Sequence, residues 1–290
     1  MPMIFLLLSI SCSVTVGVLL KFAKRYHISV IQAITWNYFF AILLSLLFFR
    51  PEFSSLQPSA FKPIFVALGI LLPVIFLVQG YAVQFAGLAR TDIAQRLSLF
   101  ISMGAAYFLF GEHFDRLKYA AMVFGFIAIV FTLFRSREKT GSKNSWFNLL
   151  LVFVGFGMID VLFKLVSQVN SIPYTTSLFL IFCIAFALSL LYILYGAIMK
   201  RQKLQLINFI CGCILGFFNF GNILFYLKAH RAMADSPFLV FATMNLGVII
   251  MGSLIGIFSF KEKLSKINYI GLALAVLSVV LLTLAKIYAV

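Results

Sequence analysis

Two stretches, "LLLSISCSVTVGVLLK" (Leu6–Lys21) and "LLLVFVGFGMIDVLFK" (Leu149–Lys164), share their length, their apolar character and their final lysine. They lie in opposite halves of a 290-residue chain. A helix needs about 20 apolar residues to cross roughly 30 Å of hydrocarbon, and each stretch comes close to that length. The pair therefore predicts membrane helices that recur in two related halves.

The composition extends this prediction to the whole chain, which is 63% apolar and only 11% charged. Soluble domains average about 25% charged residues, so the chain lacks the polar side chains that a water-facing surface needs. Because apolar runs recur throughout, we predict an all-α integral membrane protein with ten transmembrane helices. The predicted spans are residues 3–20, 30–49, 63–86, 92–110, 118–134, 147–165, 175–199, 206–228, 236–259 and 267–286.

The net charge of +15 would be typical of a nucleic-acid-binding protein if the chain were soluble. Here the basic residues stand in small clusters between apolar runs, where they fix topology against anionic lipid headgroups. We therefore expect a lipid bilayer and no nucleic acid as a partner. The clusters are Lys21, Lys24 and Arg25; Arg135, Arg137, Lys139 and Lys143; Lys200, Arg201 and Lys203; and Lys261, Lys263 and Lys266.

Further matches between the halves follow the same order. "AILLSLL" (Ala41–Leu47) aligns with "AFALSLL" (Ala185–Leu191), and "FGEHFDRLKY" (Phe110–Tyr119) aligns with "FKEKLSKINY" (Phe260–Tyr269). A polar stretch, "RSREKTGSKNS" (Arg135–Ser145), separates the halves. We predict two five-helix repeats, residues 1–140 and 141–290.

The odd number of spans in each half has a topological consequence. Five crossings make the second repeat start on the side of the membrane opposite to the first, so the two repeats are inverted. Inverted repeats are typical of secondary transporters, which bind substrate near the midplane where the repeats meet. This parity points to a transporter with a central cavity.

Several motifs resemble those of the EamA-type family of the drug/metabolite transporter superfamily. They are "LARTDIAQRLSLFIS" at the start of the fourth span, "FGE" and "FKE" ending at Glu112 and Glu262, and "GLALAVLSVVLL" in the last span. The resemblance covers nearly the whole chain. It implies a basket-like bundle with a central cavity, alternating access, and export or exchange of amino acids or related metabolites.

Positive charge in short loops favours the cytoplasmic side. The loops after odd-numbered spans hold fourteen lysines and arginines, and the even loops with the C-terminus hold eight. This bias predicts both termini outside, whereas the family resemblance implies both inside. The chain lacks glycosylation-bearing loops, and we expect a multi-pass protein of a bacterial inner membrane.

Asp160 is the main candidate for function, because an ionised carboxylate at bilayer depth costs about 2.5–3.5 kcal/mol on insertion scales. Lys164 follows one helical turn later, in the favourable order for an i,i+4 ion pair. The pair has two interpretations: a static ion pair in the cavity wall, or a site for a proton or a substrate amine. In the alignment of the two halves, Lys164 matches Lys21, but Asp160 matches Gly17. Repeat symmetry can therefore account for the lysine and not for Asp160, which favours a functional role for Asp160.

A second charged group, Asp92 and Arg96, stands at the start of the fourth span. Thr91 as N-cap and Asp92 in the first turn would explain a simple helix start, with Arg90 in the turn before it. That interpretation leaves Arg96 unexplained, one turn into the span. Arg96 could instead meet a substrate carboxylate from the cavity wall.

Uncharged polar side chains on other spans complete the predicted cavity lining. Amides inside membranes also join helices to one another, and for each residue alone that role is the simpler one. The residues on the aligned third and eighth spans place amides at the repeat interface. The candidates are Gln79, Tyr81 and Gln84 on the third span, Asn219 and Asn222 on the eighth, Trp36 and Asn37 on the second, and Asn245 on the ninth.

Other residues indicate scaffold roles. Glycine pairs at four-residue spacing, Gly212 with Gly216 and Gly252 with Gly256, predict close helix contacts. Glu112 and Glu262 stand at span ends, where a carboxylate need not be buried, and repeat symmetry makes them scaffold candidates that could bind loop backbone or nearby lysines.

The leading function is secondary transport of small polar metabolites, amino acids or related compounds, with export as the expected direction and protons as candidate coupling ions. A passive facilitator of the same fold and a lipid-linked sugar flippase are alternatives. An enzyme is disfavoured, because the sequence has no H-E-x-x-H motif and no spaced nucleophile–base pair. Neither a metal nor a nucleotide cofactor is indicated, since metal-ligand spacing and a P-loop are missing.

Overall fold

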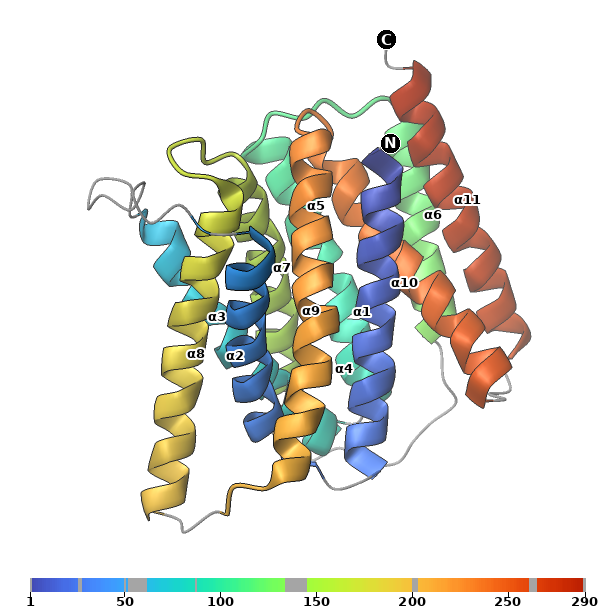
Figure 1. The fold of residues 1–290 in the computed structure, drawn as a ribbon. Helices are drawn as coiled ribbons and strands as arrows, with labels where there is room; N and C mark the ends of the chain where they lie inside the picture. Colours follow the sequence, from blue (N-terminus) through green and yellow to red (C-terminus); the bar gives the residue numbers. More distant parts are fainter. Residues whose placement is uncertain are drawn as a thin grey trace.

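The computed structural model describes residues 2–25, 28–49, 51, 62–86, 88–133, 145–199, 203–260 and 265–288. Within these residues the chain is all-helical, and its long helices run side by side between two ends of a bundle (Figure 1). Both termini lie at one end, which we call the terminus-side end. The helices are α1 (Pro2–Arg25), α2 (Val30–Phe49), α3 (Pro63–Ala86), α4 (Leu88–Leu97), α5 (Leu99–Phe108), α6 (Arg116–Leu133), α7 (Ser145–Ser167), α8 (Tyr174–Met199), α9 (Leu206–Ala232), α10 (Pro237–Phe260) and α11 (Lys266–Tyr288).

By length and composition, seven of the described helices could cross a membrane. These helices indicate a multi-pass membrane protein. The count of ten spans stays a prediction. The seven are α2, α3, α7, α8, α9, α10 and α11, and the apolar part of α1 is shorter.

The predicted fourth span is divided into α4 and α5 at Ser98. The Ser98 hydroxyl donates to the Gln95 carbonyl oxygen at 2.5 Å, and the Ile101 N–H bonds the Ser98 carbonyl three residues back. A serine that bonds its own preceding turn tightens and bends a helix. The single helix expected over residues 92–110 is thus two ten-residue pieces.

The predicted start of that span is also wrong. Since α4 begins at Leu88, Thr91 is not an N-cap but a buried helical residue, 1% exposed. Arg90 and Asp92 likewise lie inside the helix rather than at its entry. Leu88 and Ala89 are strong helix formers, so the helix forms before the chain reaches the threonine.

The helix contacts join the two halves of the chain throughout the bundle. The most extensive contacts link α6 with α11, α2 with α9, α1 with α9, and α3 with α7. Each of these pairs takes one helix from before residue 134 and one from after residue 144. One buried apolar core therefore contains side chains from both halves.

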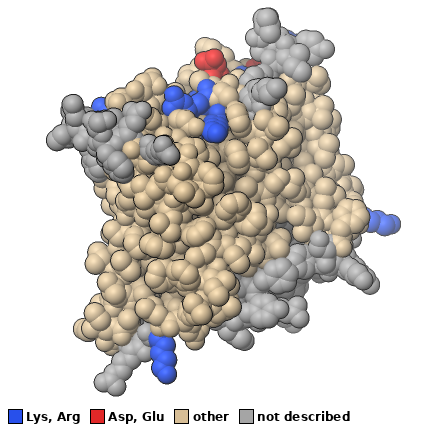
Figure 2. Space-filling view, viewed as in Figure 1, with Lys and Arg blue, Asp and Glu red and all other residues tan. Residues whose placement is uncertain are grey.

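The surface agrees with a membrane environment. On the face in Figure 2, a broad band without charged side chains separates the lysines and arginines near one end from those toward the other. Large apolar side chains are exposed on α8, among them Leu191, Tyr195 and Ile198. Such a surface suits hydrocarbon and not water.

Glycines set how closely several helices approach. A Cβ atom on Gly212 would lie 2.4 Å from the Trp36 Cβ atom, and one on Gly216 would lie 2.7 Å from the Asn37 carbonyl oxygen. These two glycines allow α9 to pack on α2, as predicted. The prediction fails at Gly252, where an added Cβ would meet nothing within 4 Å.

The aligned motifs near residues 110 and 260 begin their helices in the same way. Asp115 Oδ1 accepts the Lys118 N–H at 2.7 Å ahead of α6. Ser265 Oγ accepts the Asn268 N–H at 3.2 Å ahead of α11, and Asn268 Oδ1 accepts the Ser265 N–H in return. Both are N-caps that satisfy the third helical N–H group.

Replacing Gly212 with alanine should destabilise the protein by about 1–3 kcal/mol, because backbone and Cβ atoms of α2 block the added methyl group. Thermal unfolding in detergent would show a midpoint several degrees lower. Gly252→Ala is the matched control and should leave the midpoint unchanged or slightly raised, since alanine favours a helix. Equal midpoints for both variants would show that the α2–α9 contact tolerates the added atom.

Candidate functional site

The Asp160 carboxylate lies between helices from both halves of the chain. Its Oδ2 atom accepts a hydrogen bond from the Ser102 hydroxyl on α5 at 3.0 Å. Its Oδ1 atom accepts one from the Tyr226 hydroxyl on α9 at 3.0 Å. Ser102 and Tyr226 are buried, whereas Asp160 itself is only half-buried. Each carboxylate oxygen therefore has one fixed donor and keeps capacity for another.

Two further polar side chains act on the same carboxylate. The guanidinium of Arg96 on α4 interacts with it electrostatically, and the amide of Asn245 on α10 also interacts with it. Asn245 Nδ2 is anchored by donating to the Phe241 carbonyl oxygen at 3.0 Å. Five helices thus contribute to one polar centre, which we call the Asp160 site: Arg96 (α4), Ser102 (α5), Asp160 (α7), Tyr226 (α9) and Asn245 (α10).

The glycines of α7 position this site. A Cβ atom on Gly157 would lie 2.6 Å from the Ile101 Cβ atom, so only glycine lets α5 come this close to α7. That approach brings Ser102, the next residue of α5, to the carboxylate. Gly155 does the same for α3, because its Cβ would lie 2.2 Å from Ile75 Cδ1. Helix packing and site geometry therefore depend on the same short segment of α7.

The i,i+4 geometry of Asp160 and Lys164 does not produce an ion pair, although the structure describes both side chains. Lys164 is fully buried, and its Nζ atom donates to the Ala234 carbonyl oxygen at 2.7 Å. The static-pair interpretation is therefore wrong for this conformation. The reason is competition, since donors on α5 and α9 hold the carboxylate while the α9–α10 turn accepts from the ammonium.

The predicted amides lie in three places. Gln79 Nε2 on α3 donates to Gln95 Oε1 on α4 at 2.9 Å. Asn222 on α9 accepts the Ser9 hydroxyl of α1 through its Oδ1 atom at 2.8 Å. Asn37 and Asn219 are buried at 6% exposure each, in α2 and α9. Gln79 and Asn222 thus join helices, and among the predicted amides whose side chains the structure describes, Asn245 alone interacts with Asp160.

The two predicted aromatic residues lie away from this centre. Trp36 packs edge-on against Phe209, with ring centroids 5.0 Å apart, and so belongs to the α2–α9 contact. Tyr81 is 47% exposed on α3. The side chains of Lys21, Gln84 and Asp92, and the whole of Glu262, lie outside the described residues.

Sequence reasoning missed Ser102, Tyr226 and His230. Tyr226 and His230 follow Asn222 on α9 at four-residue spacing, so they share the face of a residue that was selected. His230 is fully buried, and its ring lies 4.6 Å from that of Tyr226. Ser102 gives no comparable signal, because a lone serine in an apolar run is common.

Two other features of the described residues bear on binding. They contain no group of three or more His, Cys, Asp or Glu side chains that could hold a metal ion. A groove of about 370 Å³ between α5 and α7 is lined entirely by apolar residues, including Ile101, Phe108 and Met158. The predicted central cavity stays a prediction.

Comparison with known proteins gives three similarities. The model of the EamA-like transporter family matches residues 1–134. A protein of Haemophilus influenzae described as an uncharacterized protein is 40% identical over 275 residues, which is 92% of this chain and 93% of that one. A crystal structure of a protein with 15% identity superimposes with a TM-score of 0.76, over 98% of this chain and 96% of that chain, and shows the fold alone.

The family match lies on the half of the chain that contains Arg96 and Ser102, and the relative extends the similarity across α7, α9 and α10. An all-helical membrane bundle agrees with that match. This chain belongs to the EamA-like transporter family of the drug/metabolite transporter superfamily.

Proposed function

We propose that this protein is a secondary-active transporter that exports small polar metabolites, amino acids or related compounds, by alternating access. The observation that carries the proposal is the Asp160 site, a half-buried carboxylate with an arginine beside it inside an apolar bundle. Intramembrane charges are costly and usually mark substrate or ion pathways. No enzymatic role is proposed, because the family to which the chain belongs is one of transporters.

Inverted repeats over residues 1–140 and 141–290 are part of the proposal, and the helix contacts support them. Exchanging the halves maps α1 onto α7, α2 onto α8 and α3 onto α9. The contact of α1 with α9 then corresponds to that of α7 with α3, and the contact of α2 with α9 to that of α8 with α3. Both corresponding pairs are present, as a pseudo-two-fold arrangement requires.

The charges of the site favour a zwitterionic substrate. Besides the Ser102 and Tyr226 hydroxyls and the Asn245 amide, the Asp160 carboxylate could accept a further hydrogen bond from a substrate ammonium group. Arg96 would bind a substrate carboxylate, for which its planar guanidinium is suited. An α-amino acid carries both groups within a few ångströms of each other.

Proton coupling at Asp160 is the second part of the mechanism. A carboxylate that binds either a proton or an ammonium group exchanges one for the other, which is antiport. The charge bias of the loops supports placing the terminus-side end outside a bacterial inner membrane.

Proteoliposomes containing the protein should accumulate at least one labelled amino acid when a pH gradient is imposed. Without the gradient, the same compound should only equilibrate. Uptake of a panel of amino acids, with and without the gradient, measures both results. Equilibration alone under both conditions would favour a passive facilitator, and transport of lipid-linked sugars but no amino acid would favour a flippase.

Asp160→Asn should reduce amino-acid transport by roughly tenfold to a hundredfold, because a hydrogen bond to a charged group contributes about 1.5–3 kcal/mol. Dependence on the pH gradient should disappear as well. Asp115→Asn is the matched control, since Asp115 is an exposed cap of α6 and asparagine caps equally well. Full gradient-driven transport by Asp160→Asn would refute the coupling role.

Arg96→Gln should raise the KM for amino acids by about tenfold, because a charge-assisted hydrogen bond to the carboxylate is lost. The corresponding amines without a carboxylate should be unaffected in competition assays. Arg116→Gln, at the exposed start of α6, is the control and should transport normally. An equal KM change for amines and amino acids would show that Arg96 acts on the structure and not on the carboxylate.

A further inference from the structure

We propose that Lys164 and Glu112 form a gate that holds the α9–α10 turn over the terminus-side end of the Asp160 site. This structure would then be closed at that end. The inference rests on the proposed alternating access, and it assigns the gate residues that such a transporter requires. Neither residue contacts Asp160, so both would act through the turn that they hold.

The first contact is that of Lys164. Its Nζ atom donates to the Ala234 carbonyl oxygen at 2.7 Å, between the end of α9 at Ala232 and the start of α10 at Pro237. The ammonium also lies 5.8 Å from the centre of the Phe110 ring. A charge-assisted hydrogen bond stabilises a buried ammonium group, and this stabilisation is lost when the turn moves away.

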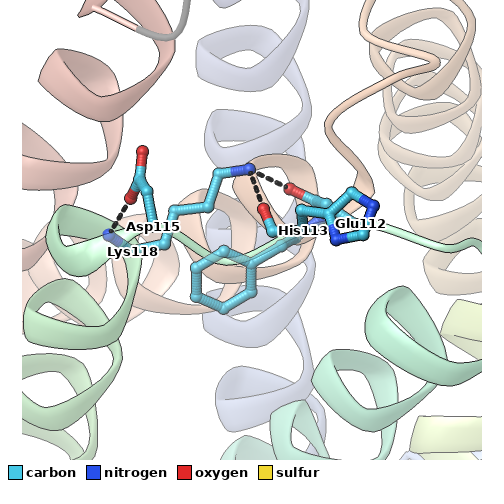
Figure 3. Close-up of polar contacts among 5 residues, drawn as sticks. Glu112, His113, Asp115 and Lys118 are labelled. Carbon is cyan, nitrogen blue, oxygen red and sulfur yellow. Dashed lines mark hydrogen bonds and ion pairs between the residues drawn. The ribbon is translucent and has the colours of Figure 1, made fainter.

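The second contact is that of Glu112, and Figure 3 shows its ion pair with Lys118. Its Oε2 atom accepts the Phe238 N–H at 2.8 Å, which fixes the first turn of α10. Its Oε1 atom lies 3.0 Å from Lys118 Nζ, and that ammonium also donates to the His113 carbonyl oxygen. Glu112 is only 6% exposed, and it binds a backbone N–H group and a lysine, as predicted for a scaffold residue at this span end.

The two contacts come from different halves of the chain. Glu112 follows α5 in the first half, and Lys164 is on α7 in the second. Both hold the short segment Ala234–Phe238, which lies with the α9–α10 turn at the terminus-side end (Figure 1). A segment held by both halves is released when they move relative to each other, as alternating access requires.

Burial differs on the two sides of Asp160. Toward the terminus-side end, a layer of side chains is at most 4% exposed: Phe163, His230, Met233, Phe238 and Phe241. Toward the opposite end, the polar side chains of Gln79, Gln95 and Arg96 are half-buried, as is Asp160 itself. They lie beside a small buried apolar cluster of Ala82, Ala94 and Val152. The mostly aromatic buried layer therefore lies on the side of the turn that Lys164 and Glu112 hold.

The closed layer contains one polar side chain, that of His230, which lacks a hydrogen-bond partner among the described residues in this conformation. No described residue makes a hydrogen bond to either ring nitrogen of His230, and Lys164 lies close enough to act on that ring electrostatically. Lys164 in turn interacts with Asp235 and Glu112. Buried polar groups without partners are costly, and water entering an opened gate would satisfy them.

The position of Lys164 connects the gate to the site. It lies one turn after Asp160 on α7, and His230 lies one turn after Tyr226 on α9. Tyr226 donates to Asp160. A substrate that moves α7 against α9 at the level of Asp160 therefore also displaces the layer above.

Side-specific labelling of a cysteine in the site tests the gate. The reporter is Ser102→Cys in a chain whose native cysteines, Cys12, Cys183, Cys211 and Cys213, are replaced by serine. A membrane-impermeant charged thiol reagent is added to either side of proteoliposomes, and a C-terminal tag reports which end faces the bath. With the gate intact, labelling should be slow from the terminus side and faster from the opposite side.

Lys164→Met or Glu112→Gln in this background should raise terminus-side labelling by about tenfold, the change expected for losing one charge-assisted hydrogen bond. Labelling from the opposite side should not rise. Lys164→Arg, which keeps a charged donor, should restore the slow rate. Lys266→Gln, an exposed lysine at the start of α11, is the control and should change nothing.

Two results would refute the proposal that Lys164 and Glu112 form a gate. Unchanged terminus-side labelling in both variants would show that neither residue closes the path. An equal rise from both sides would show general loosening of the bundle. The labelling does not depend on transport. A wild-type protein that moves no amino acid would therefore refute the proposed substrate, and the labelling rates would still test the gate.

Discussion

The Asp160 carboxylate needs hydrogen-bond donors that hydrocarbon cannot supply, and this need organises the centre of the bundle. The donors come from neighbouring helices, Ser102 on α5 and Tyr226 on α9, at 3.0 Å each. Arg96 and Asn245 add two more helices to the same centre. This one carboxylate thus brings together side chains from five helices, which span both halves of the chain.

That arrangement is possible only because the helices approach closely at defined points. Gly157 admits Ile101 and so brings Ser102 to the carboxylate, while Gly212 and Gly216 seat α9 against α2. In a membrane no hydrophobic effect drives helices together, so close contact and shared polar groups carry the association. The packing residues and the site residues are therefore interdependent: a change in one helix contact moves a donor of the site.

The same dependence extends toward the terminus-side end. Asp160 and Lys164 share a face of α7, yet each finds its partner on another element. In the proposed mechanism, the lower level, Asp160 with Tyr226, recognises charge, and the upper level, Lys164 with the α9–α10 turn, closes the path. Because Asp160 and Lys164 are one helical turn apart on α7, a movement of this helix displaces both side chains. Their different partners allow them to act in different steps of the proposed transport cycle.

The sequence by itself determined the class of the molecule. Apolar runs between short basic clusters specify membrane helices whatever their neighbours are, and the aligned motifs near residues 110 and 260 specify helix starts through local caps. It also singled out Asp160, Arg96 and Asn245, because a polar residue in an apolar run carries a cost that can be assessed locally. The spacing of Gly212 and Gly216 likewise indicated a close contact.

The tertiary structure decided which side chains meet. Helical spacing suggested that Asp160 pairs with Lys164, but the partners are set by α5, α9 and the α9–α10 turn, which no local pattern encodes. Gly252 has the same spacing signal as Gly212 and faces open space. Ser102 and the break at Ser98 gave no sequence signal that separates them from other serines. Periodicity fixes the face of a helix, whereas the neighbour on that face depends on how all the helices pack at once.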